Sequence, residues 1–140
     1  MGAKDIQITL DFRSGLPIYV QIVEQIRKMV ASSELQVGDQ LPTVRQLATD
    51  LRINWNTVAR AYKLLDEAGL ISTQQGRGTY IWEAPTEEIT VQLRQQALDG
   101  LTRRFLAEAV RLGCSPQDVA AVFEQYMSLW RAGDTPDDEN

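Results

Sequence analysis

A short polar segment in the first half of the chain carries side chains that can read the edges of DNA base pairs. On a helix with about 100° per residue, Asn56, Arg60 and Lys63 fall opposite Val58 and Leu65. Amide and guanidinium groups can form paired hydrogen bonds with adenine and guanine, and a lysine can meet guanine or a phosphate. Most polar helix faces are simply solvated, so this face needs support from its surroundings.

The beginning of this helix is the part expected to meet bases. Thr57 adds a hydroxyl and a methyl group beside Asn56. Recognition helices contact bases mainly through their N-terminal residues, which favours Asn56, Thr57 and Arg60 over Glu67. We expect Glu67 to limit how far the helix enters a groove.

A glycine-bearing turn supplies the second candidate contact. Two short β-type runs, 70–72 and 79–82, surround a turn in which Gly76 and Gly78 flank Arg77. Such a tip can approach the sugar-phosphate surface and place a cation in or beside the minor groove. A plain tight hairpin would explain the glycines but not the arginine.

Arg45 is a third candidate and has two interpretations. It lies at the expected start of a helix, where backbone N–H groups also attract phosphate. The alternative is a surface salt bridge with Asp39 or Asp50.

The elements that position these side chains form a winged helix-turn-helix over residues 1–82. Residues 7–12 resemble a strand, and Pro17 fits the first turn of a helix with apolar residues at helical spacing. Thr43 and Gln46 match a capping box, Asn54 suits the cap of a third helix, and Gly69 fits its end. The apolar residues of the first helix are Tyr19, Ile22, Val23, Ile26, Met29 and Val30.

Residues 83–132 predict an antiparallel two-helix dimerisation element, so the fold class is mainly α with a small β-hairpin. Thr86 caps a helix to about Leu112, and Ser115 caps a second helix that begins with Pro116. Apolar residues spaced by seven along the first helix, and a stripe on the second, need a partner surface. The expected dimerisation residues are Val91, Leu98, Leu101, Phe105, Leu112, Phe123, Tyr126 and Trp130. Residues 133–140 predict an acidic disordered tail.

Charge is distributed unevenly along the chain. The net charge of -5 argues mildly against DNA binding, but residues 1–82 hold nine Lys and Arg against eight Asp and Glu. Residues 83–140 hold five against eleven. The weakly basic first part predicts that one domain alone binds DNA poorly.

The sequence carries few motifs that would indicate an enzyme or a metal-binding protein. It contains no histidine, no cysteine pair for zinc, no phosphate-binding glycine loop and no nucleophile elbow, so we expect no enzyme, cofactor or metal site. The single Cys114 cannot form an intramolecular disulfide. No apolar run approaches the ~20 residues of a membrane span, and no secretory signal is recognisable, so we expect a cytoplasmic protein without membrane contact.

Several of these motifs, in order and spacing, resemble the GntR family of bacterial regulators. They are residues 41–48 (LPTVRQLA), 54–62 (NWNTVARAY), 70–71 (LI) and 76–81 (GRGTYI). The resemblance implies that Arg45, Thr57, Arg60, Gly76 and Arg77 contact DNA. The short C-terminal part resembles the YtrA subfamily, which implies a homodimeric repressor that binds a palindromic operator in double-stranded DNA. Trp55 departs from the small residue or proline that the resemblance implies before residues 56–58.

Two questions remain open at this stage. The same winged helix could be a protein-interaction module if its basic face met an acidic protein. A small-molecule effector, of unknown identity, would have to bind at the dimer interface or between it and the wing. Phe123, Tyr126 and Trp130 could line that site, but core packing explains them at least as well.

Overall fold

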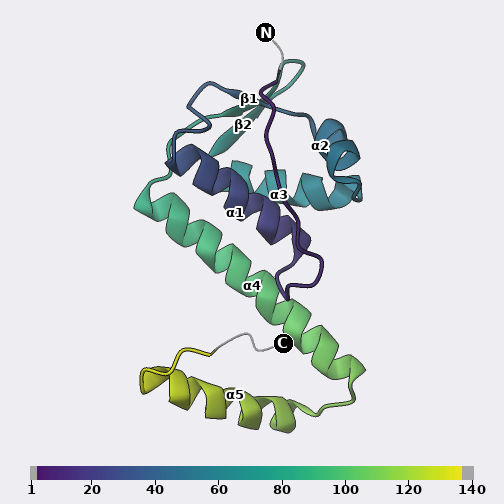
Figure 1. Cartoon of the computed structure of the whole chain (residues 1–140), viewed down its shortest axis with the longest axis vertical. Coiled ribbons are helices and arrows are strands. Elements are labelled where there is room, and N and C mark those ends of the chain that lie inside the picture. Colours follow the sequence, from purple (N-terminus) through teal and green to yellow (C-terminus); the bar gives the residue numbers. More distant parts are fainter. Residues whose placement is uncertain (1–2, 137–140) are drawn as a thin grey trace. The chain divides into compact units, whose positions relative to one another are not determined.

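The computed structural model describes residues 3–136 and consists of five helices and three short strands over that range (Figure 1). Contacts divide the chain into two compact units, Met1–Leu101 and Thr102–Asn140. The order of elements confirms the predicted fold class. It is α1 (Ile18–Ala31), β1 (Gln40–Leu41), α2 (Val44–Leu51), α3 (Trp55–Glu67), β2 (Ile71–Gln74), β3 (Gly78–Ile81), α4 (Glu87–Arg111) and α5 (Pro116–Arg131).

The sheet is antiparallel, with β3 between β1 and β2. Ile71 pairs with Ile81 and Gln74 with Gly78, so the hairpin has a three-residue loop. β1 pairs Gln40 with Tyr80, and the N–H of Lys4 donates to the Gln40 carbonyl at 2.8 Å. The sequence indicated only a loop at 40–41, because two residues show no alternating pattern.

Local capping chemistry sets the helix starts as predicted. The Thr43 side chain and Gln46 form a capping box at α2, and Asn54 accepts from the N–H of Asn56 at α3. Ser115 and Asp118 form a second capping box at α5. These interactions satisfy N–H groups that no preceding turn can bond.

The predicted strand at residues 7–12 is wrong. No strand is assigned there, and two glutamines of α1 bond the extended chain instead. The Gln25 amide bonds both the N–H and the carbonyl of Thr9, at 2.9 and 2.7 Å. The Gln21 amide bonds the same two groups of Asp11, each at 2.8 Å. Side chains therefore satisfy backbone groups that would otherwise require a neighbouring strand.

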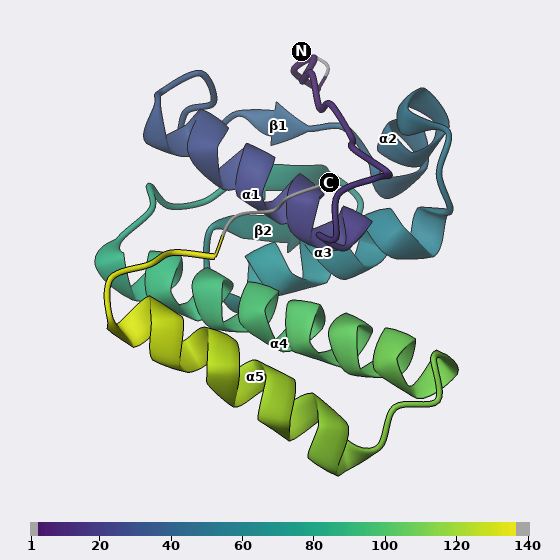
Figure 2. The same ribbon diagram turned by 60° about the horizontal axis from the view of Figure 1, so that its bottom comes forward.

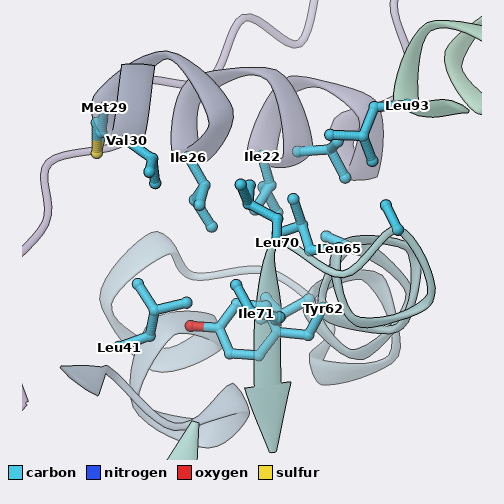
Figure 3. Packing of buried hydrophobic residues seen from close by; sticks show 14 of the residues in the cluster. Ile22, Ile26, Met29, Val30, Leu41, Tyr62, Leu65, Leu70, Ile71 and Leu93 are labelled. Carbon is cyan, nitrogen blue, oxygen red and sulfur yellow. The ribbon is translucent and has the colours of Figure 1, made fainter. Parts of the chain in front are cut away.

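The core of the first unit lies between α1, α3 and the sheet (Figure 3). Ile22 and Ile26 of α1 point toward Leu65, Leu70 and Ile71, and all five side chains are buried. α2 contributes to the same cluster through Leu47 and Ala48. This cluster fixes the outer surface of α3 relative to the sheet.

The beginning of α4 belongs to this core. Ile89 and Leu93 are buried in the cluster, and Ala97 packs against it. The side chain of Gln92 also donates to the carbonyl of Glu67, at the end of α3, at 3.4 Å. The first unit therefore continues past residue 82, and the division between DNA-binding and dimerisation regions remains a prediction.

The second unit contains the end of α4 and the whole of α5 (Figure 2). Phe105 and Phe123 meet edge to face, with ring centroids 5.3 Å apart. No residue of α5 is buried, although the helix carries a row of large apolar side chains. The predicted tail begins at residue 133, but residues 137–140 lie outside the described part. No helix among the described residues is long and apolar enough to cross a membrane.

Candidate nucleic-acid interface

The outer face of α3 combines a rigid base with exposed polar groups. Val58 and Leu65 are fully buried beneath the helix, whereas Asn56, Arg60 and Lys63 are exposed. Thr57 lies half-buried in the first turn, where its N–H donates to the Asn54 carbonyl. Asn56, Arg60 and Lys63 are therefore exposed on a helix that the core holds in place, and their role in reading bases remains a prediction.

A buried hydrogen bond fixes α3 against the loop that leads into α2. The Tyr62 hydroxyl donates to the carbonyl of Pro42 at 2.7 Å. Burial raises the pKa of the Tyr62 phenol well above its usual range, so it remains a donor at physiological pH. Between the two helices, Arg52 adopts a left-handed conformation with φ of 57°. These features set the angle of the helix-turn-helix.

Arg60 makes a contact that the helical wheel did not predict. Its guanidinium carbon lies 4.0 Å from the centre of the Tyr19 ring, which belongs to α1. Arginine over an aromatic face is attracted by the negative face of the ring. The side chain remains exposed, so Arg60 is supported from one side and open on another.

Lys63 has a nearby carboxylate. Its Nζ atom lies 3.9 Å from Glu67 Oε1, and both side chains are largely exposed. A pair of this kind contributes little to stability and can be exchanged for another partner. Lys63 is therefore free to turn toward a phosphate.

Arg77 lies at the tip of the wing, on a turn that two hydrogen bonds hold in place. The Arg77 carbonyl accepts from the Gln40 amide at 3.2 Å and from the Tyr80 hydroxyl at 3.1 Å. Gly76 has φ of 77°, a conformation that favours glycine. The sequence predicts a flexible tip. In the structure, these two hydrogen bonds hold the backbone of the tip at Arg77 and leave the Arg77 side chain exposed.

Arg45 lies exposed in the first turn of α2. The predicted alternative partner Asp39 is engaged elsewhere, with the Gln36 N–H at 2.8 Å and Lys4 Nζ at 3.1 Å. The hydrogen bond from Gln36, and then that from Lys4, hold the pKa of the Asp39 carboxyl below its usual range. Among residues 3–136, no ion pair is recorded for Arg45, which leaves it available to an anion.

The expected dimerisation residues are distributed over both units. Leu101 is half-buried in the first unit, where Val91 and Leu98 of the same helix are exposed. The remaining five lie in the second unit, and all of them are exposed: Phe105, Leu112, Phe123, Tyr126 and Trp130.

Sequence reasoning missed two supporting residues. The sequence predicts Tyr19 only as an apolar residue of the first helix and Gln40 only as part of a loop. Neither position carries a local signal, because the contacts with Arg60 and Arg77 join segments 41 and 37 residues apart. The neighbouring Trp55 is exposed at the first residue of α3, next to Asn56 in the sequence.

The chain is similar in sequence and structure to known transcriptional regulators. Residues 18–81 match the model of bacterial regulatory proteins of the gntR family. The chain is 49% identical over 76 residues to the HTH-type transcriptional repressor YtrA of Bacillus subtilis, which is 54% of this chain and 58% of that protein. It is 34% identical over 110 residues to the uncharacterized HTH-type transcriptional regulator YhcF of the same organism, covering 77% and 88%. A solved structure of YtrA from Sulfolobus acidocaldarius, described as a GntR-family transcription factor, is 30% identical, covers 86% of this chain and 97% of that one, and gives a TM-score of 0.51.

Proposed function

Because the chain belongs to the GntR family of bacterial regulatory proteins and resembles its YtrA-type members, we propose that it is a homodimeric repressor of transcription. It binds a palindromic operator in double-stranded DNA through α3 and the wing β2–β3. The family consists of regulatory proteins, in agreement with the expectation that the chain is not an enzyme.

The exposed face of α3 is the observation that carries this proposal. Asn56 and Arg60 present an amide and a guanidinium at the N-terminal part of a helix whose opposite side is fully packed. These are the groups that distinguish adenine and guanine in the major groove. Thr57 lies next to Asn56 in the first turn, and Lys63 lies about one turn beyond Arg60.

Arg45 and Arg77 supply contacts that position the domain. Each is exposed, and each lies on a different element of the first unit, α2 and the wing. Contacts with phosphate and sugar fix the register of a protein on DNA but carry no direct sequence information. The division of roles is therefore base reading by α3 and anchoring by Arg45, Gly76 and Arg77.

The second unit supports the dimeric part of the proposal. Its row of Phe123, Tyr126 and Trp130 is about half exposed, at 48%, 53% and 55%. Residues 1–82 hold only one more positive than negative side chain, so two linked copies would reach an affinity that one copy does not. Two half-sites on one face of DNA lie about 34–36 Å apart, or a multiple of that distance.

Binding to a selected operator at several salt concentrations tests the proposal. Fluorescence anisotropy should show affinity that falls steeply as salt rises, because bound cations release counterions from DNA. Binding that is indifferent to salt would refute it, and an acidic protein that displaces the operator more effectively than nonspecific DNA would favour a protein-interaction module.

Two substitutions separate reading from anchoring. Arg60→Ala should reduce discrimination at one base pair by ~1–3 kcal/mol, whereas Arg77→Ala should weaken all sequences similarly. Arg94→Ala is a matched control, because Arg94 is exposed on α4 of the same unit. Equal losses at every position for both Arg60→Ala and Arg77→Ala would contradict these assignments.

A further inference from the structure

A glycine lies inside α4 at a position where glycine normally weakens a helix. Gly100 is well within Glu87–Arg111, and glycine in a helix interior costs about 1 kcal/mol relative to alanine. The structure supplies a reason, because a β-carbon at Gly100 would overlap the Tyr19 hydroxyl and lie 3.0 Å from ring carbon Cζ. The hydroxyl end of the Tyr19 ring therefore packs against the backbone of α4 at Gly100.

Tyr19 contacts both α4 at Gly100 and Arg60 on the candidate reading face of α3. The side chain is 7% exposed and belongs to the core cluster. One face of its ring carries the Arg60 guanidinium at 4.0 Å, while its hydroxyl end meets α4 at Gly100. All three residues lie in the first compact unit.

We propose that Tyr19 is a positioning residue for base recognition, which orients the Arg60 guanidinium, and that the close approach of α4 at Gly100 sets the Tyr19 ring. This inference rests on the proposed function, because it assigns Arg60 a base to read. It adds α4 to the elements that determine DNA specificity, through the packing of its backbone at Gly100 against Tyr19.

The physical basis is the loss of freedom in Arg60. A long arginine side chain loses rotamer entropy when it binds, so a platform that orders it beforehand lowers that cost. The Tyr19 ring can change its orientation only by rotation about χ1 and χ2. Because the hydroxyl is rigidly attached to the ring, a displacement of the hydroxyl must tilt or shift the ring face. A change at Gly100 therefore reaches Arg60 without altering any residue at the reading face.

Substitutions at Gly100 and Tyr19 in the full chain test this arrangement. Gly100→Ala should displace the ring and reduce discrimination at the base pair identified by Arg60→Ala by about 2- to 5-fold, the size of an exposed cation–π contact. Tyr19→Phe removes the overlapping oxygen and keeps the ring face, so its discrimination should remain close to that of the unmodified chain. The double variant Tyr19→Phe with Gly100→Ala should recover most of the loss.

A readout without DNA follows the contact itself. The side-chain protons of Arg60 above the Tyr19 ring should show an upfield shift in the NMR spectrum. Gly100→Ala should reduce that shift, and the added Tyr19→Phe substitution should restore it. Gln95→Ala, at an exposed position of the same helix, is the control and should change neither readout.

The outcomes separate this inference from the function on which it rests. An unmodified chain that binds every sequence alike would refute the proposed function and the inference with it. If the unmodified chain discriminates and Gly100→Ala discriminates equally well, the inference alone is wrong. Should Gly100→Ala fail to fold, Tyr19→Leu removes the ring and should show the same loss; undiminished discrimination in that variant would also overturn the inference.

Discussion

The two compact units of this chain treat their apolar residues in opposite ways. The first unit buries most of them in one core, where Ile22, Val58 and Leu65 are completely inaccessible. The second unit exposes them, and Tyr126 and Trp130 are 53% and 55% accessible. A surface with contiguous large apolar side chains marks a contact with another molecule. This contrast supports the proposal that the second unit pairs with another copy of the chain, whereas the first unit packs around a core of its own.

The polar side chains that are candidates for DNA contact also belong to only one of the two units. The candidate DNA contacts on α2, α3 and the wing all lie in the first unit, on elements that the core holds in place. A rigid scaffold presents such groups with less loss of entropy than a mobile one. We interpret the first unit as the reading part and the second as the pairing part.

Leu93→Ala should have the largest effect, because it opens a cavity where α4 completes the first unit. Leu93 is 0% exposed, and truncating a buried leucine costs ~2–5 kcal/mol of unfolding free energy. Urea denaturation followed by tryptophan fluorescence measures the loss. Gln95→Ala on the same helix should stay within about 0.5 kcal/mol. Equal stability of both variants would show that α4 is not part of the first unit.

Trp130→Ala should weaken self-association by at least ~2 kcal/mol, or about 30-fold, if the second unit is the pairing part. The matched control is Trp82→Ala, because Trp82 is similarly exposed, at 60%, but lies in the first unit. Sedimentation over a range of concentrations measures both. Association that depends on Trp82 and not on Trp130 would reverse the proposed roles of the two units.

Tyr62→Phe should destabilise the first unit by about 1 kcal/mol, the net value of one buried hydrogen bond. The Tyr62 hydroxyl reaches the Pro42 carbonyl in the buried interior. Tyr80→Phe is the control, because the Tyr80 hydroxyl bonds Arg77 on the exposed wing. Thermal unfolding of the two variants should rank Tyr62→Phe as the less stable. The opposite rank would mean that the wing contact, and not the buried one, fixes the unit.

A pH dependence at the start of α5 should be the smallest effect. Hydrogen bonds from Ser115, chiefly from its backbone N–H, hold the pKa of the Asp118 carboxyl below its usual range. The ionised carboxylate therefore stabilises the helix fully above the unfolded pKa of about 3.9. This contribution is lost as the pH falls through the lower folded value. An NMR titration of Asp118 should give a pKa below the value of about 3.9 for an unperturbed aspartate, and a pKa at or above that value would exclude the cap.

Features set by near neighbours could be predicted from the sequence. The caps at Thr43, Asn54 and Ser115 use bonds that span two or three residues, and their residue types are selective. The polar face of α3 also follows from helical spacing alone. These features recur in the structure with boundaries shifted by at most a few residues.

Contacts between distant segments could not be predicted in this way. β1 depends on pairing with β3, and its two residues carry no periodicity of their own. The spacing of Ile89, Leu93 and Ala97 fits a helix face, but the exposed stripe on the same helix gave a competing signal. The support of Arg60 by Tyr19 requires that α1 and α3 pack together, which no local pattern specifies.

Binding of the unmodified chain to DNA with one or two half-sites tests most directly whether reading and pairing are divided between the units. Two inverted half-sites about 10 base pairs apart should bind much more tightly than a single half-site, and a shift of about five base pairs should remove that advantage. Trp130→Ala should bind both DNAs with nearly the same affinity. Equal affinity of the unmodified chain for one and two half-sites would contradict the account.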